Sequence, residues 1–156
     1  MLWDFAGVDG LAVAVALFGG PVKKLAPWRS LVTPDSRYAV LRLCEGNFRI
    51  RTAEGDQDFP AKLAQACAEK RVWYAQLAYL EALSFPRDAI LPRLEQVATP
   101  KPPFRLHHLP IDCALPARID STAIILWRYC WQGADLVQIH CSREHRQKIS
   151  GYLQLQ

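Results

Sequence analysis

The sequence has no hydrophobic run long enough to cross a membrane and no cysteine spacing typical of a secreted disulfide scaffold. Its most apolar segment, GLAVAVALFGG at residues 10–20, is far shorter than the roughly 20 residues that span a bilayer. Asp4 and Asp9 stand where a signal peptide carries positive charge, and no A-x-A cleavage site follows. The five cysteines form an odd set without C-x-x-C spacing. We therefore expect a soluble, cytoplasmic protein with no membrane partner.

Sequence motifs for catalysis are missing as well: there is no G-x-S-x-G, H-E-x-x-H or Rossmann glycine pattern. Cys130 and His140 fit a diagonal cross-strand nucleophilic pair, but no third group is visible that would orient the histidine. Cys130, His140, Cys141 and His145 are residue types that bind zinc. Strand alternation, however, places Cys141 on the face opposite to Cys130 and His140, so the four side chains do not converge on one ion. We expect no catalytic residue, cofactor or metal. A third functional interpretation, beside the two binding roles given below, is a small hydrolase or ligand-binding enzyme that uses His140.

The overall composition is that of a folded protein. Of the 156 residues, 51% are hydrophobic and 22% are charged, and a chain of this length can bury the core of one domain. We expect a single domain over residues 1–156. Nineteen basic against fifteen acidic residues give a formal net charge of +4, which mildly favours anionic partners.

The apolar segment at residues 10–18 alternates larger residues with alanine and ends at Gly19-Gly20-Pro21. A period of two with β-branched residues favours a buried strand, while the alanine content leaves a helix as the alternative. The GGPVKK that follows lacks the G-x-x-x-x-G-K-[ST] spacing with which backbone amides and lysine hold phosphate. We interpret it as an ordinary turn.

Residues 38–51, YAVLRLCEGNFRIR, contain two short apolar runs joined around Glu45 and Gly46, which predicts a β-hairpin. With a two-residue turn at either possible position, the same residues fall on the core face. That face carries Ala39, Leu41, Leu43, Phe48 and Ile50, and the opposite face carries Tyr38, Arg42, Arg49 and Arg51.

In this register Arg42 lies opposite Arg49 or Arg51, and like charges directly opposite one another destabilise a strand pair. The arginines could extend into solvent or pair with the acidic residues at 54–58. Alternatively, a phosphate or carboxylate between the guanidinium groups would turn the repulsion into charge-assisted hydrogen bonding.

A long helix is expected after the hairpin. Asp58 is an N-cap type of residue and Pro60 lies within the first turn, and apolar residues then recur three and four apart as far as Leu80. The spacing predicts a helix over residues 59–83 that covers the core face of the sheet. Trp73 and Tyr74 are interpreted as packing residues of this helix. Pro86 and Pro92 should bracket a short helical piece.

A second hairpin is predicted from Ser121 onwards, with a three-residue loop at residues 133–135. This register places Trp127, Tyr129 and Trp131 on a wholly apolar face. Its other face pairs Arg128 with His140 and Cys130 with Gln138. Ser142 should then cap a short terminal helix that carries Arg143, His145, Arg146 and Lys148.

These patterns predict an α+β fold, mainly an antiparallel sheet of two hairpins with a long helix on one face and a short C-terminal helix. The exposed sheet face and the terminal helix would be basic, which favours a non-catalytic protein that binds nucleic acid or a nucleoprotein complex. The alternative is a protein-interaction subunit or inhibitor that docks through a Trp/Arg-rich surface. The predicted anion-binding residues are Tyr38, Arg42, Arg49, Arg51, Arg128, His140, Arg143, Arg146 and Lys148.

Overall fold

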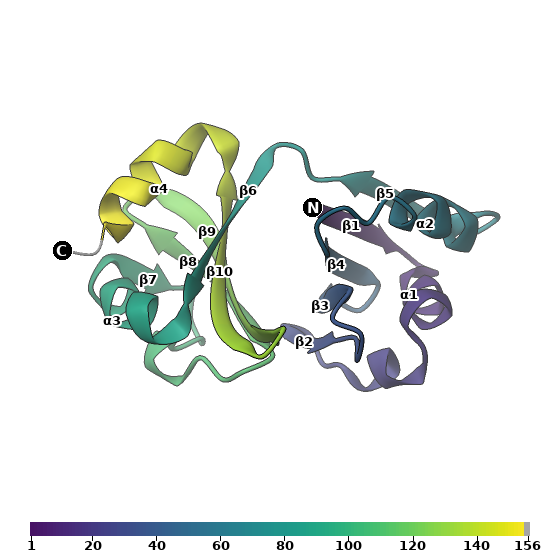
Figure 1. The fold of residues 1–156 in the computed structure, drawn as a ribbon, viewed down its shortest axis with the longest axis horizontal. Coiled ribbons are helices and arrows are strands. Elements are labelled where there is room, and N and C mark those ends of the chain that lie inside the picture. The colour runs from purple at the N-terminus through teal and green to yellow at the C-terminus, as the bar shows by residue number, and fades with distance from the viewer. Residues whose placement is uncertain (155–156) are drawn as a thin grey trace. The chain divides into compact units, whose positions relative to one another are not determined.

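The computed structural model describes residues 1–154, except the side chain of His108. The chain divides into two compact units, Met1–Leu77 and Ala78–Gln156, and each unit has its own hydrophobic core. Both units combine antiparallel strands with α-helices, in agreement with the predicted α+β class (Figure 1). Within residues 1–154, no helix has both the length and the apolarity that a membrane crossing requires.

The first unit is a sheet with the strand order β5-β1-β4-β3-β2, and both of its α-helices lie on one face of that sheet (Figure 1). Phe5 from β1 stacks on Phe48 from β4, with 5.4 Å between the ring centroids, beneath Leu63 of α2. Its elements are β1 (Leu2–Gly7), α1 (Gly10–Phe18), the 3-10 helix η1 (Gly20–Lys24), β2 (Arg29–Val32), β3 (Tyr38–Cys44), β4 (Asn47–Thr52), α2 (Phe59–Cys67) and β5 (Val72–Gln76).

The strand predicted at residues 10–18 is wrong, because this segment forms the helix α1. Alanine is the best helix former, and the helix buries Val13 and Ala14 against the sheet. A glycine begins the helix because a Cβ at Gly10 would collide with the backbone oxygen of Gly46 in the β3–β4 turn. The buried residues of this segment lie on one face of the helix. The alternation with a period of two arises because alanine is compatible with a helix as well as with a strand.

The long helix predicted over residues 59–83 is also wrong. The helix α2 begins at Phe59, as the Asp58 and Pro60 signals indicate, but it ends at Cys67. Glu69 then adopts a left-handed conformation with φ of 58°, which turns the chain into β5. The β-branched and aromatic residues of the VWYAQ segment suit a strand, and Trp73 is 59% exposed instead of packed in a core.

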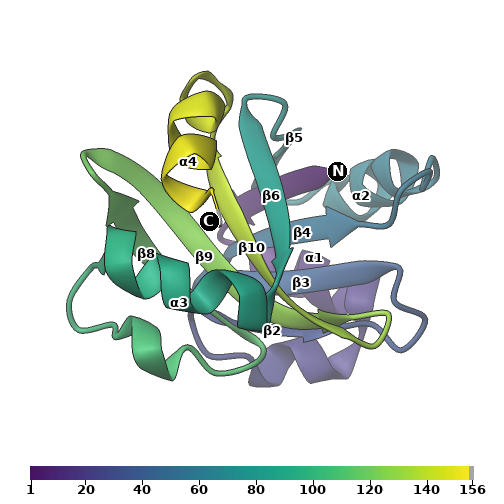
Figure 2. The ribbon, with the colours of Figure 1, turned by 60° about the vertical axis from the view of Figure 1, so that its left-hand side comes forward.

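The second unit is a sheet with the order β8-β9-β10-β6, and β7 pairs with β8 outside this path. The helices α3 and α4 lie on the same side of this sheet and cover its core (Figure 2). Its elements are β6 (Leu80–Pro86), α3 (Arg87–Val97), β7 (Ala98–Pro100), η2 (Leu106–His108), β8 (Cys113–Ile119), β9 (Thr122–Trp131), β10 (Ala134–Ser142), η3 (Arg143–His145) and α4 (Arg146–Leu153).

The helical piece predicted between Pro86 and Pro92 begins where expected but is longer. Pro86 is the N-cap residue of α3, whereas Pro92 lies inside the helix, which continues to Val97. The core residues Ile90 and Leu94 are both fully buried and lie on either side of this proline. Tertiary packing therefore holds the helix together across the hydrogen bond that the proline removes.

The β9–β10 hairpin is confirmed, but its predicted register is wrong. The turn consists of the two residues Gln132 and Gly133, whose φ angles of 51° and 83° match a type I′ turn. As a result Trp131 pairs with Ala134. The predicted loop would place Trp131 opposite Val137, so the observed pairing is shifted by three residues. A shift by an odd number of residues exchanges the faces of one strand relative to the other, so the predicted apolar face does not form. Trp127 now lies opposite Gln138.

Candidate functional site

The first hairpin is also confirmed, but Arg42 and Arg49 point to opposite faces of its sheet. Cys44 pairs with Asn47, as one of the two possible turns predicts, and a β-bulge between Arg42 and Cys44 then places Arg42 opposite Phe48 and Leu41 opposite Arg49. Arg42 therefore shares the helix-covered face, and its guanidinium carbon lies 5.7 Å from the centroid of the Phe48 ring. The predicted face that collects three arginines and Tyr38 does not form.

Arg49 is committed to a buried ion pair with Asp4 on the neighbouring strand β1. Its Nε and Nη2 atoms donate to the two carboxylate oxygens at 2.8 and 2.9 Å, a bidentate geometry. Arg49 is 6% exposed and Asp4 is 8% exposed. Arg51 is half-buried on the same face, where it pairs with Leu2 and Ala39. An ion pair this deeply buried has a structural role.

Arg42 ties a loop to the hairpin instead of presenting its charge to a ligand. Its guanidinium donates to the backbone oxygens of Leu25, Cys44 and Glu45 at 2.7, 3.2 and 2.8 Å. Three carbonyl acceptors occupy most of the donor capacity of one guanidinium. This arrangement holds the segment after η1 against the β3–β4 turn.

Tyr38 belongs to the core of the first unit, where only 9% of its surface is exposed. Its ring packs against Phe59 with 5.2 Å between centroids and against Phe18 with 5.6 Å. Burial, together with the nearby Asp56 carboxylate, raises the pKa of Tyr38 to about 12. A ring held in this way is not an exposed platform on which a nucleic-acid base could stack.

In the second unit, Arg128 and His140 also lie on opposite faces. Arg128 donates to both carboxylate oxygens of Asp135 at 2.9 and 2.6 Å, and these hydrogen bonds hold the pKa of Asp135 below its usual value. His140 is buried and pairs across the strands with Ile125, while its Nε2 lies 2.8 Å from Oε1 of Gln138. Cys130 lies on the face of Arg128, so Cys130 and His140 do not share the face on which the predicted register places them.

The basic residues around the C-terminal helix are engaged in ion pairs. Arg143 and Arg146 lie 3.2 and 3.9 Å from the same Glu81 oxygen, and Lys148 lies 2.7 Å from Asp120. Within residues 1–154, no group of three or more His, Cys, Asp or Glu side chains is arranged to hold a metal ion.

A different surface stands out in the first unit, and we call residues 71–76 the β5 edge. β5 lies at the end of the unit's strand order and pairs with β1. Trp73 is 59% exposed on the face away from the helices, and the Arg71 side chain, two positions earlier, is 75% exposed. Tyr74, on the opposite face, is 39% exposed. The edge therefore presents aromatic residues and an arginine together with the hydrogen-bonding groups of an edge strand.

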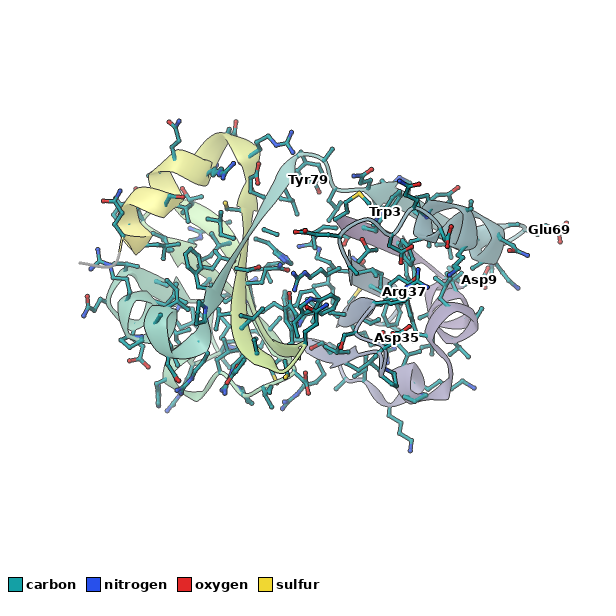
Figure 3. The ribbon with its side chains drawn as sticks, viewed as in Figure 1. Trp3, Asp9, Asp35, Arg37, Glu69 and Tyr79 are labelled. Carbon is teal, nitrogen blue, oxygen red and sulfur yellow. The ribbon has the colours of Figure 1, made fainter. Side chains whose placement is uncertain are left out.

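Asp9 fixes the start of the β5 edge. Its carboxylate accepts hydrogen bonds from the backbone nitrogen of Arg71 at 2.8 Å and from the Arg71 guanidinium at 3.3 Å. These hydrogen bonds hold the pKa of Asp9 below its usual value. Asp9 and Glu69 lie at the end of the unit from which β5 starts (Figure 3). The VWYAQ segment carries the strand signal, although the apolar spacing places it in the predicted helix over residues 59–83.

No family model matches the sequence, and no curated protein matches it. The fold is similar to aminomethyltransferase T of the glycine cleavage system from Bartonella henselae, with a TM-score of 0.73 and 15% identity over 97% of this chain. It is equally similar to heterotetrameric sarcosine oxidase from Corynebacterium sp. U-96 in complex with pyrrole 2-carboxylate, with a TM-score of 0.73, 18% identity and the same 97% coverage.

This chain spans 42% of the aminomethyltransferase chain and 76% of the sarcosine oxidase chain. At these identities the similarity defines a fold that occurs in enzymes and in a multi-chain oxidase. The prediction of a nucleic-acid-binding protein is wrong, because its arginine face does not form and the fold is that of enzyme-associated chains. The alternative, a chain that docks on another protein, agrees better with these findings.

Proposed function

We propose that this chain is a protein-interaction subunit that docks on an enzyme partner through the β5 edge. The observation that carries the proposal is the exposed Trp73 beside the exposed Arg71 on an edge strand. Tryptophan and arginine are the residue types most enriched at the energetic centres of protein interfaces. The similarity to a chain of a heterotetrameric oxidase supports a role in an assembly.

The position of β5 at the edge of the sheet determines how a partner could bind. An extended segment of the partner would pair with the backbone groups of β5, which supplies affinity that does not depend on side chains. Trp73 would insert into an apolar pocket of the partner. The exposed Arg71 guanidinium would exchange its ion pair with Asp9 for a carboxylate of the partner, while the Arg71 backbone nitrogen stays bonded to Asp9. The partner segment should therefore be extended, apolar and acidic.

Co-purification from the organism that encodes the chain tests this proposal. The tagged full-length chain should retain a protein in a fixed molar ratio, and the variant Trp73→Thr should lose it. Replacement of a central interface tryptophan commonly costs at least about 2 kcal/mol, or roughly a thirtyfold loss of affinity. Threonine keeps the strand propensity of the site, so the variant should fold.

Tyr79→Thr is the matched control, because Tyr79 is 63% exposed and lies outside the β5 edge, at the start of the second unit. It should retain the partner at the level of the unmodified chain. The proposal fails if no protein is retained in a fixed ratio, or if the Trp73 variant retains as much as the Tyr79 variant.

A further inference from the structure

A groove of about 470 Å³ opens between α1 and α2 in the first unit, away from the β5 edge. This volume lies in the range of about 300–1,000 Å³ that is typical of small-molecule sites. The groove is formed by the last turn of α1, the first residue of β3 and one face of α2. Its lining residues are Ala16, Leu17, Phe18, Tyr38, Phe59, Lys62, Gln65 and Ala66.

The groove has an aromatic floor. The Phe18 and Phe59 rings are nearly parallel, at 22° with 6.4 Å between centroids, and Tyr38 lies within 5.6 Å of both. Each ring is held by the core of the unit and cannot turn freely. Phe59 is 1% exposed and Tyr38 9%, so the ring that faces the groove is the half-buried Phe18, which the two buried rings hold in place. A ring that is already ordered favours a planar ligand, because stacking on it costs little further ordering.

The charge at the groove selects the sign of the ligand. Lys62 is the charged residue of the lining, and it is exposed at the rim beside Gln65, three residues later on α2. Within the described part of the chain, neither side chain makes a hydrogen bond or an ion pair. An ammonium group and an amide above an apolar floor complement a carboxylate attached to a flat ring.

We propose that the α1–α2 groove binds a small aromatic carboxylate, with the ring of the ligand on Phe18 and the carboxylate on Lys62. The site is separate from the β5 edge, and the proposal does not rest on the docking function. Trp73 lies on the sheet face away from α2, so Trp73→Thr should leave ligand binding unchanged.

Titration of the full chain with naphthalene-2-carboxylate, followed by amide chemical shifts, tests the proposal. Saturable shifts should occur at residues 16–18 and 59–66. The neutral probe naphthalene-2-carboxamide should bind about fivefold more weakly, the worth of one partly solvated ion pair. The variant Lys62→Gln should show the same loss for the carboxylate, whereas Lys24→Gln, an exposed lysine outside the lining, should not.

Ala16→Phe provides a steric test, because Ala16 is exposed on α1 and a larger side chain there would fill the groove without entering the core. It should abolish the shifts, while Ala12→Phe, an exposed alanine one turn earlier on the same helix, should preserve them. The proposal is overturned if the unmodified chain shows no saturable binding. It is equally overturned if the two probes bind alike, or if Ala16→Phe binds as well as Ala12→Phe.

Discussion

At the scale of single residues, three of the arginines predicted to bind an anion are held by partners within the protein. Arg42 is held by backbone carbonyls, Arg49 by Asp4 and Arg128 by Asp135. The residue types were visible in the sequence, but their partners were not. Asp4 lies 45 positions from Arg49, and only the β1–β4 pairing brings the two together.

Breaking the buried pair should be costly. Asp4→Leu leaves the Arg49 guanidinium buried without its carboxylate, and we expect a loss of about 3–5 kcal/mol in the free energy of unfolding. The double variant Asp4→Leu/Arg49→Met removes both charges and should recover most of this loss. Urea denaturation of both variants measures the difference. A single variant within about 1 kcal/mol of the unmodified chain would show that the pair is not structural.

Tyr38 should make stability fall at alkaline pH. Its pKa is about 12 in the folded protein against 10.0 for an ordinary tyrosine, so its contribution is complete below pH 10 and is lost as the pH rises towards 12. Tyr38→Phe has no such titration, so the unmodified chain should lose stability relative to this variant over that range. Unfolding free energies of both proteins at several alkaline pH values measure this. Parallel curves would contradict the assignment.

At the scale of elements, both hairpins could be predicted, but neither register could. Alternating apolar residues around Gly46 and Gly133 identify the turns, whereas one residue at the bulge or in the loop decides which side chains share a face. The errors at residues 10–18 and 68–83 have another cause. Alanine-rich and aromatic segments suit both helix and strand by local preference, and tertiary packing decides between them.

The β9–β10 turn gives a direct test of its conformation. Gly133 has a φ of 83° with open space around its Cα, so Gly133→Ala should cost about 1–2 kcal/mol from backbone strain alone. Gly151 is exposed within α4 and also has open space, and Gly151→Ala should instead stabilise by about 0.5–1 kcal/mol. Thermal unfolding of both variants checks the opposite signs. A Gly133→Ala variant as stable as the unmodified chain would refute the turn type.

At the scale of the whole molecule, the single domain stays a prediction, because each unit has its own core. Leu63 and Leu126 are both fully buried, one in each core. In a single cooperative domain, Leu63→Ala and Leu126→Ala should each cost about 2–5 kcal/mol and shift the same unfolding transition. Calorimetry distinguishes this from two transitions that respond separately, which would indicate two domains.

For the proposed docking surface, the sequence indicates the types of residue but not their positions. The alternative of a Trp/Arg-rich surface names the residue types that the proposed β5 edge exposes at Trp73 and Arg71. The other tryptophans could not be sorted by exposure from the sequence: Trp3, Trp127 and Trp131 are buried, and the strand partners of Trp3 lie 47 and 73 positions away, at Ile50 and Gln76. Exposure is a property of the fold, and local sequence does not determine it.

The most direct test is the affinity of the purified partner for the chain with and without Trp73. We expect Trp73→Thr to weaken binding by roughly thirtyfold or more, since truncation of an interface tryptophan commonly costs at least about 2 kcal/mol. Tyr79→Thr, of similar exposure, should bind as the unmodified chain does. Equal dissociation constants for the two variants would contradict the assignment of the β5 edge as the docking surface.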